Sequence, residues 1–135
     1  MRDTTAQDVP SRRRVIARVT LGLFLFVAGI GHFTFGREAF TAQVPGWLPL
    51  PADLVVGASG IVELALGASL IALPRHRAAL GWITAAFFVA VFPGNIAQFV
   101  DRVDAFGLTT DGARGVRLLF QPLLVLWALW STRRR

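Results

Sequence analysis

The sequence contains no cysteine, only two histidines and no lysine. Without cysteine, the chain forms no disulfide and carries no thiol redox centre, Cys-ligated zinc site or iron–sulfur cluster of its own. His32 falls at the predicted outer face of the membrane and His76 in a predicted inner loop. They therefore cannot hold one haem iron within a single chain. No metal site is predicted.

All fourteen basic residues are arginine, and they give the chain a net charge of +6. These arginines stand at the ends of apolar segments instead of forming one polar face, so we do not predict nucleic-acid binding. Basic flanks of this kind are typical of the cytoplasmic loops of membrane proteins. The chain is 54% hydrophobic, above the about 45–50% that is usual for soluble domains.

The apolar excess falls in four segments, which predict helices at about 15–35, 54–73, 78–100 and 113–131. A membrane-spanning helix needs about 20 residues, and the first three segments supply them without difficulty. The fourth has a shorter uncharged run, Leu118 to Thr132, so Arg117 must enter the membrane edge by snorkelling. Continuous apolar runs argue against β-strands.

The predicted fold is therefore an all-α integral membrane four-helix bundle, with the bilayer as its surroundings. One domain covers residues 15–132 of the 135, between a disordered basic tail at 1–14 and a basic tail at 133–135.

Loop charges predict the orientation of this bundle. Arginines gather in the N-terminal flank, the second loop and the C-terminus, whereas acidic residues gather in the third loop at Asp101, Asp104 and Asp111. By the positive-inside rule, both termini are cytoplasmic in a multi-pass protein of the inner membrane.

The segment Ser11 to Ile16 resembles a twin-arginine export signal. The apolar stretch that follows lacks a clear small-residue cleavage site and precedes three further membrane segments. We therefore interpret it as a membrane anchor.

Glu63 is the sharpest candidate for function. It is the only charged residue of the second segment and lies near its middle, where an acidic side chain costs roughly 2.5–3.5 kcal/mol. The carboxyl group is expected to be protonated or paired, and an ion pair with Arg117 that only fixes the packing is the structural alternative. Ser59, Gly60 and Gly67 share its helix face, which predicts a close helix-packing face.

Further polar residues fall in the outer half of all four helices. The predicted polar pocket comprises His32, Glu63, Asn95, Gln98, Arg117 and Gln121. Interhelical hydrogen bonding is the structural alternative for the two glutamines and the asparagine. A short interfacial helix is predicted over 37–44, before a proline-rich stretch lying along the outer membrane surface.

Five short motifs carry a family resemblance. They are Gly31-His32-Phe33, Val44-Pro45-Gly46-Trp47-Leu48-Pro49, Ser59-Gly60-Ile61-Val62-Glu63, Val91-Phe92-Pro93-Gly94-Asn95, and Arg117 to Pro122 followed by Leu126-Trp127-Ala128. In this order, over residues 15–132, they resemble the DoxX-like family of small bacterial membrane proteins.

The resemblance implies a four-helix membrane bundle associated with redox chemistry. The related DoxD protein is a membrane subunit of a thiosulfate:quinone oxidoreductase, and more distant relatives assist the assembly of membrane receptors. The family supplies no proven catalytic residue for this chain, so the catalytic residues are unassigned.

Three hypotheses follow. The first is a membrane subunit of a quinone-linked oxidoreductase, with a lipophilic quinone as ligand and a protein partner as electron source. The second is a non-catalytic accessory or assembly factor, bound to another membrane protein or to a second copy of this chain. The third is a small proton-coupled transporter. The residues leave open whether the chain is an enzyme, and they name no substrate.

Overall fold

The computed structural model describes residues 9–102 and 110–134, and every element within these ranges is helical. The long helices are α1 (Arg12–Phe33), α3 (Ala52–Ala72), α4 (Arg77–Val100) and α5 (Asp111–Thr132). The short elements are α2 (Arg37–Ala42) and the 3-10 helix η2 (Pro74–His76). All four long helices are long and apolar enough to cross a membrane, so the all-α prediction with four apolar helices is confirmed.

A hydroxyl group caps the start of two helices, α1 and α5. Ser11 accepts a hydrogen bond from the backbone N–H of Arg14, so α1 begins at Arg12, inside the tail predicted at 1–14. Thr110 accepts from the backbone N–H of Ala113 and starts α5. Such caps satisfy amide groups that a helix start leaves without an intrahelical acceptor. Residues 1–8, Asp104 and residue 135 lie outside the described part.

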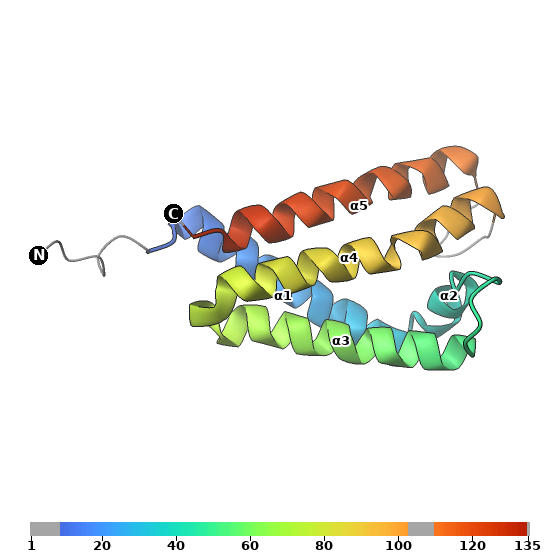
Figure 1. The fold of residues 1–135 in the computed structure, drawn as a ribbon, viewed down its shortest axis with the longest axis horizontal. Helices are drawn as coiled ribbons and strands as arrows, with labels where there is room; N and C mark the ends of the chain where they lie inside the picture. The colour runs from blue at the N-terminus through green and yellow to red at the C-terminus, as the bar shows by residue number, and fades with distance from the viewer. Residues whose placement is uncertain (1–8, 103–109, 135) are drawn as a thin grey trace, which may run out of the picture.

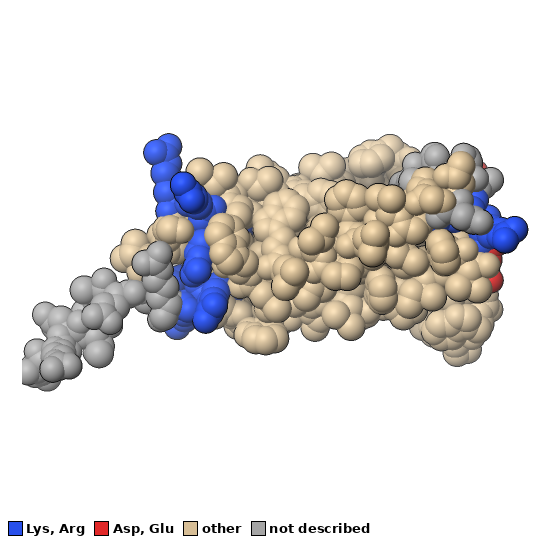
Figure 2. Space-filling model, turned by 90° about the horizontal axis from the view of Figure 1, so that it is seen from above, with Lys and Arg blue, Asp and Glu red and all other residues tan. Residues whose placement is uncertain are grey.

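The long helices form two neighbouring pairs, α1 with α3 and α4 with α5 (Figure 1). The start of α1 and the end of α5 lie at one end of the bundle, and α2 lies at the other. We call these the basic end and the α2 end, because arginines gather around the first and acidic side chains appear only near the second in Figure 2.

The buried apolar core fills only the half of the bundle nearest the basic end. It consists of Leu21, Leu25, Leu66, Leu70, Ala85, Phe88 and Ala128. Many other large apolar side chains lie on the outside, among them Ile61 at 63% and Leu119 at 70% exposure. Helices that are apolar on their outer faces as well as their inner ones are typical of membrane spans.

Glycines allow α1 and α3 to approach closely. A Cβ atom on Gly67 would lie 2.6 Å from the backbone oxygen of Gly22 and 2.7 Å from the backbone nitrogen of Phe26. A Cβ on Gly60 would lie 2.7 Å from the Cβ of His32. Both glycines of the predicted packing face therefore lie against α1, where small residues let helix backbones pack tightly.

Candidate functional site

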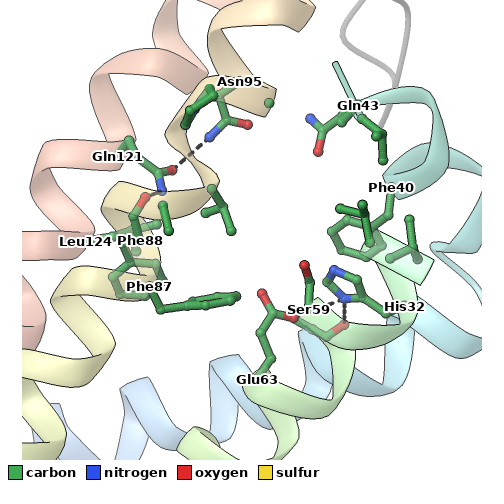
Figure 3. Close-up of a pocket in the computed structure, with 18 of the residues that line it drawn as sticks. His32, Phe40, Gln43, Ser59, Glu63, Phe87, Phe88, Asn95, Gln121 and Leu124 are labelled. Carbon is green, nitrogen blue, oxygen red and sulfur yellow. Dashed lines mark hydrogen bonds and ion pairs between the residues drawn. The ribbon is translucent and has the colours of Figure 1, made fainter. Parts of the chain in front are cut away.

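A cavity of about 910 Å³ occupies the half of the bundle nearest the α2 end (Figure 3). All four long helices contribute to its lining, together with α2 and the loop that follows it. The apolar core ends at Phe88, which also lines the cavity. The polar residues and the open volume therefore share the half of the molecule that the core leaves unfilled.

One wall carries a buried histidine and glutamate in contact. The Nδ1 atom of His32 lies 2.9 Å from the carbonyl oxygen of Ala28 and 3.0 Å from Oε2 of Glu63. A carbonyl oxygen only accepts hydrogen bonds, so Nδ1 carries a proton and donates it to Ala28. The buried Oε2 of Glu63 therefore lies at ion-pair distance but has no hydrogen-bond donor among the described residues.

Two charge states suit this pair. In one, an imidazolium faces a carboxylate; in the other, a neutral imidazole faces a protonated carboxyl group. Both arrangements avoid an uncompensated buried charge. The structure pairs Glu63 with His32, which replaces the ion pair with Arg117 considered from the sequence.

Helix α2 fixes the orientation of the histidine. The ring of Phe40 stacks on the imidazole, with 3.6 Å between ring centroids and 14° between ring planes. The second ring nitrogen of His32, Nε2, is turned toward the open space in Figure 3. A ligand in the cavity can therefore exchange a hydrogen bond with Nε2 while the other nitrogen keeps its contacts. Ser59, expected on the packing face, lines the cavity beside Glu63.

A chain of amide hydrogen bonds forms the opposite wall. Asn95 Nδ2 donates to Gln121 Oε1 at 2.8 Å, and Gln121 Nε2 donates to the carbonyl oxygen of Phe88 at 2.6 Å. The Nε atom of Arg117 donates to Asn95 Oδ1 at 3.1 Å. Asn95 and Gln121 are buried, so these bonds compensate most of the cost of removing their amides from water.

Gln43 extends this network to the segment after α2. Its Nε2 donates to Gln98 Oε1 at 2.7 Å, and its Oε1 accepts from Arg117 at 3.5 Å. Gln98 is buried behind the wall and does not line the cavity, unlike the other five residues of the predicted pocket. Gln43 was not predicted. Its only sequence signal is its position between the short helix and the proline-rich loop.

The cavity reaches the outer surface of the bundle along α1. Leu23 and Val27 line it from the middle part of this helix, and they are 53% and 54% exposed. Because these exposed residues lie away from both helix ends, we infer a lateral opening, framed by apolar side chains. The end of the cavity is covered by Pro45, Trp47 and Leu48 of the proline-rich loop.

Between its two polar walls, the cavity is lined mainly by apolar and aromatic side chains such as Phe24, Phe87, Val91 and Leu124. Apolar pockets with a few convergent polar groups are the usual form of small-molecule sites. Within the described residues, no group of three or more His, Cys, Asp or Glu side chains is placed to hold a metal ion. The geometry suits an amphiphilic molecule with hydrogen-bonding groups on two sides.

A family model covers residues 21–132, which include α3, α4, α5, the part of α1 from Leu21 onward and every cavity residue except Thr20. Its description is a domain of unknown function, DUF8561. The chain belongs to the DUF8561 family. No curated protein and no solved structure matches the chain. Membership of the DUF8561 family assigns no activity, and the DoxX-like resemblance stays a prediction.

Proposed function

We propose that the protein is a multi-pass membrane protein that binds a lipid-soluble quinone in this cavity and serves a quinone-linked oxidoreductase complex. The observation that carries the proposal is the pairing of two polar walls, His32–Glu63 and Asn95–Gln121–Arg117, across an apolar volume that opens sideways. A quinone has the matching chemistry, because it carries carbonyl groups on opposite sides of a ring and an apolar tail.

The lateral opening supports a ligand that arrives through the bilayer. Leu23 and Val27 lie on the apolar outer surface, where a membrane would place hydrocarbon. A tail can extend through this opening while the head group stays between the polar walls. The gathering of arginines at the basic end supports an orientation with that end in the cytoplasm of a bacterial cell.

The residues of the cavity suit proton and charge handling. A bound quinone would accept two electrons and two protons to become a quinol. In its imidazolium form, with the Glu63 carboxylate as counter-ion, His32 is positioned to give the proton on Nε2 to one oxygen. The second proton must come from outside this pair. On the other wall, the cation of Arg117 stabilises negative charge that develops on the second oxygen.

Electrons must come from a partner protein, because a chain without cysteine supplies no thiol or iron–sulfur centre of its own. The activity proposed here is therefore that of a membrane subunit. The geometry of the described residues gives the accessory-factor alternative less support than it gives the quinone proposal. Two of the small residues that it would use for docking, Gly60 and Gly67, already pack against α1 within the chain.

Mass spectrometry of small molecules tests the proposal directly. The protein is purified in native-lipid nanodiscs, and lipophilic molecules are extracted from the wild type and from the Glu63→Ala and His32→Ala variants. Ser69→Ala is the matched control, because Ser69 lies on the same helix as Glu63 but outside the cavity.

A stoichiometric quinone in the wild type and the control, lost from both cavity variants, supports a quinone site. No quinone in a folded wild type, or equal retention in all four proteins, overturns it. The absence of quinone together with a stably crosslinked protein partner favours the accessory-factor alternative.

A further inference from the structure

A second hollow lies at the basic end, remote from the cavity. It is a groove of about 340 Å³ between the start of α4 and the end of α5. It is lined by Ala78, Trp82, Leu129, Thr132, Arg133 and Arg134. Its lining combines apolar side chains, two arginines and an indole ring, that of Trp82, which is 69% exposed.

The basic end holds far more positive than negative charge. Within residues 9–102 and 110–134, all the acidic residues are at or beyond the middle of the bundle, toward the α2 end. By sequence, the arginines of this end belong to the N-terminal flank, the α3–α4 connection and the segment after α5, and Figure 2 shows arginine side chains gathered at this end. Among the described residues, arginines therefore outnumber acidic residues at this end, and the positive potential that results attracts anions.

Two of these arginines are buried among backbone carbonyls. Arg18 is 5% exposed and donates to the carbonyl oxygen of Leu70 near the end of α3. Arg77 is 7% exposed and donates to the carbonyl oxygen of Pro74. These carbonyl contacts hold the two guanidinium groups in place at the basic end.

The arginines of the groove are oriented by similar contacts. Arg134 donates to the carbonyl oxygen of Arg75 at 2.8 Å, which ties the end of α5 to the α3–α4 connection. Thr132 donates to Ala128 at 2.6 Å, and its side chain packs against Gly81, where a Cβ atom would overlap it. The groove is therefore a defined shape between two helices that touch at its base.

We propose that this groove binds the phosphate group of an anionic phospholipid. Arg133 and Arg134 supply the charge for the phosphate, and Ala78 and Leu129 supply an apolar floor for the glycerol and the first acyl carbons. Trp82 has the amphipathic ring that is enriched at membrane interfaces. Basic pockets between helices at the cytoplasmic side of membrane proteins are typical sites for such head groups.

Charge complementarity alone would also attract free phosphate. The apolar floor distinguishes the two, since inorganic phosphate gains nothing from Ala78 and Leu129, whereas the glycerol and acyl groups of a lipid do. The groove also opens on the side of the helices, where Trp82 is exposed with other large apolar side chains. We therefore assign it to a lipid.

Native mass spectrometry of the full chain, released from detergent micelles that contain phosphatidylglycerol or phosphatidylcholine, tests the assignment. The wild type is expected to keep one phosphatidylglycerol in preference to phosphatidylcholine. In Arg133→Gln/Arg134→Gln the affinity for phosphatidylglycerol is expected to fall by about 30-fold, or roughly fivefold for each arginine near the head group.

Two further variants make this test specific. Arg12→Gln/Arg13→Gln removes the same charge from the same end outside the groove and is expected to bind like the wild type. Ala78→Trp keeps every charge but fills the groove, and it is expected to lose the lipid. If this variant does not fold, as judged by circular dichroism, the comparison of the two double variants decides.

Equal losses in the two double variants would show general attraction to a basic surface and would overturn the site. Displacement of the lipid by millimolar inorganic phosphate as readily as by a short-chain phosphatidylglycerol would overturn the assignment to a lipid. Neither result bears on the quinone proposal, because the cavity lies in the other half of the bundle.

Discussion

Nδ1 of His32 lies 3.0 Å from Oε2 of Glu63, and the two side chains come from adjacent helices, α1 and α3. The contact is largely buried, with 6% and 12% of the two side chains exposed. It joins the last turn of α1 to the middle of α3. One contact therefore contributes both to helix packing and to the chemistry of the cavity.

Removal of the histidine is expected to destabilise the fold more than removal of both partners. In His32→Ala, the buried Glu63 carboxyl group loses its ion-pair partner, which costs about 1–3 kcal/mol in the free energy of unfolding. In His32→Ala/Glu63→Gln no charge remains at the site, so part of this loss is recovered. Unfolding by denaturant in detergent micelles measures the free energy of unfolding of the wild type, of His32→Ala, of Glu63→Gln and of the double variant. A double variant as unstable as the sum of its single variants would show that the two residues do not interact.

Close packing of α1 on α3 predicts that Gly67→Ala is destabilising. The added Cβ would meet the backbone of Gly22 and Phe26, and backbone atoms cannot rotate out of the way as side chains can. Overpacking of this kind costs about 1–3 kcal/mol. Gly57→Ala is the matched control on the same helix, because its Cβ would meet only Phe33, at 4.0 Å. Thermal unfolding in micelles compares the two, and equal midpoints would contradict the proposed packing.

The amide network predicts a smaller cost for Gln121→Leu. Leucine has a similar volume but removes the donor to Phe88 and the acceptor for Asn95. Side-chain hydrogen bonds inside membrane proteins contribute about 0.6 kcal/mol on average, so the loss of two is expected to cost about 1 kcal/mol. Leu123→Ala on the exposed face of α5 serves as a control for packing. No change in unfolding for Gln121→Leu would mean that the network is not maintained in the micelle.

Much of the fold follows directly from the sequence, because apolar runs of about 20 residues have few alternatives to a helix of spanning length. The same runs locate Glu63 near the middle of its helix, since depth follows from the rise per residue. Helix starts were placed less well. The caps Ser11 and Thr110 lie outside the apolar runs, so hydropathy alone does not reveal them.

The sequence alone does not identify the side chain that pairs with Glu63. Its identity depends on how far α1 slides along α3, and the glycine contacts of Gly60 and Gly67 set that position. His32 lies in the last turn of α1, where the sequence placed it, but only the structure shows that this turn is level with the middle of α3. Gln43 and Phe40 were missed for a related reason. The segment 37–44 was predicted as an interfacial helix, and that prediction gave no sign that Phe40, Gln43 and Val44 line the cavity.

The lateral opening gives the last prediction, that bulk at its rim slows ligand exchange. In Val27→Trp, the larger side chain stands where the cavity meets the outer surface, while both polar walls remain intact. Exchange of a quinone between nanodiscs and added vesicles is expected to slow by at least about tenfold, with little change in the amount bound at equilibrium. The exchange rate changes without the equilibrium because a barrier at the entrance affects entry and exit alike, whereas equilibrium affinity depends on the contacts inside.

Ile30→Trp is the control for the Val27→Trp variant, since Ile30 is exposed on the same helix but does not line the cavity. If both variants exchange quinone at the wild-type rate, the ligand enters elsewhere, and the loop at Pro45 to Leu48 becomes the next place to look for the entrance.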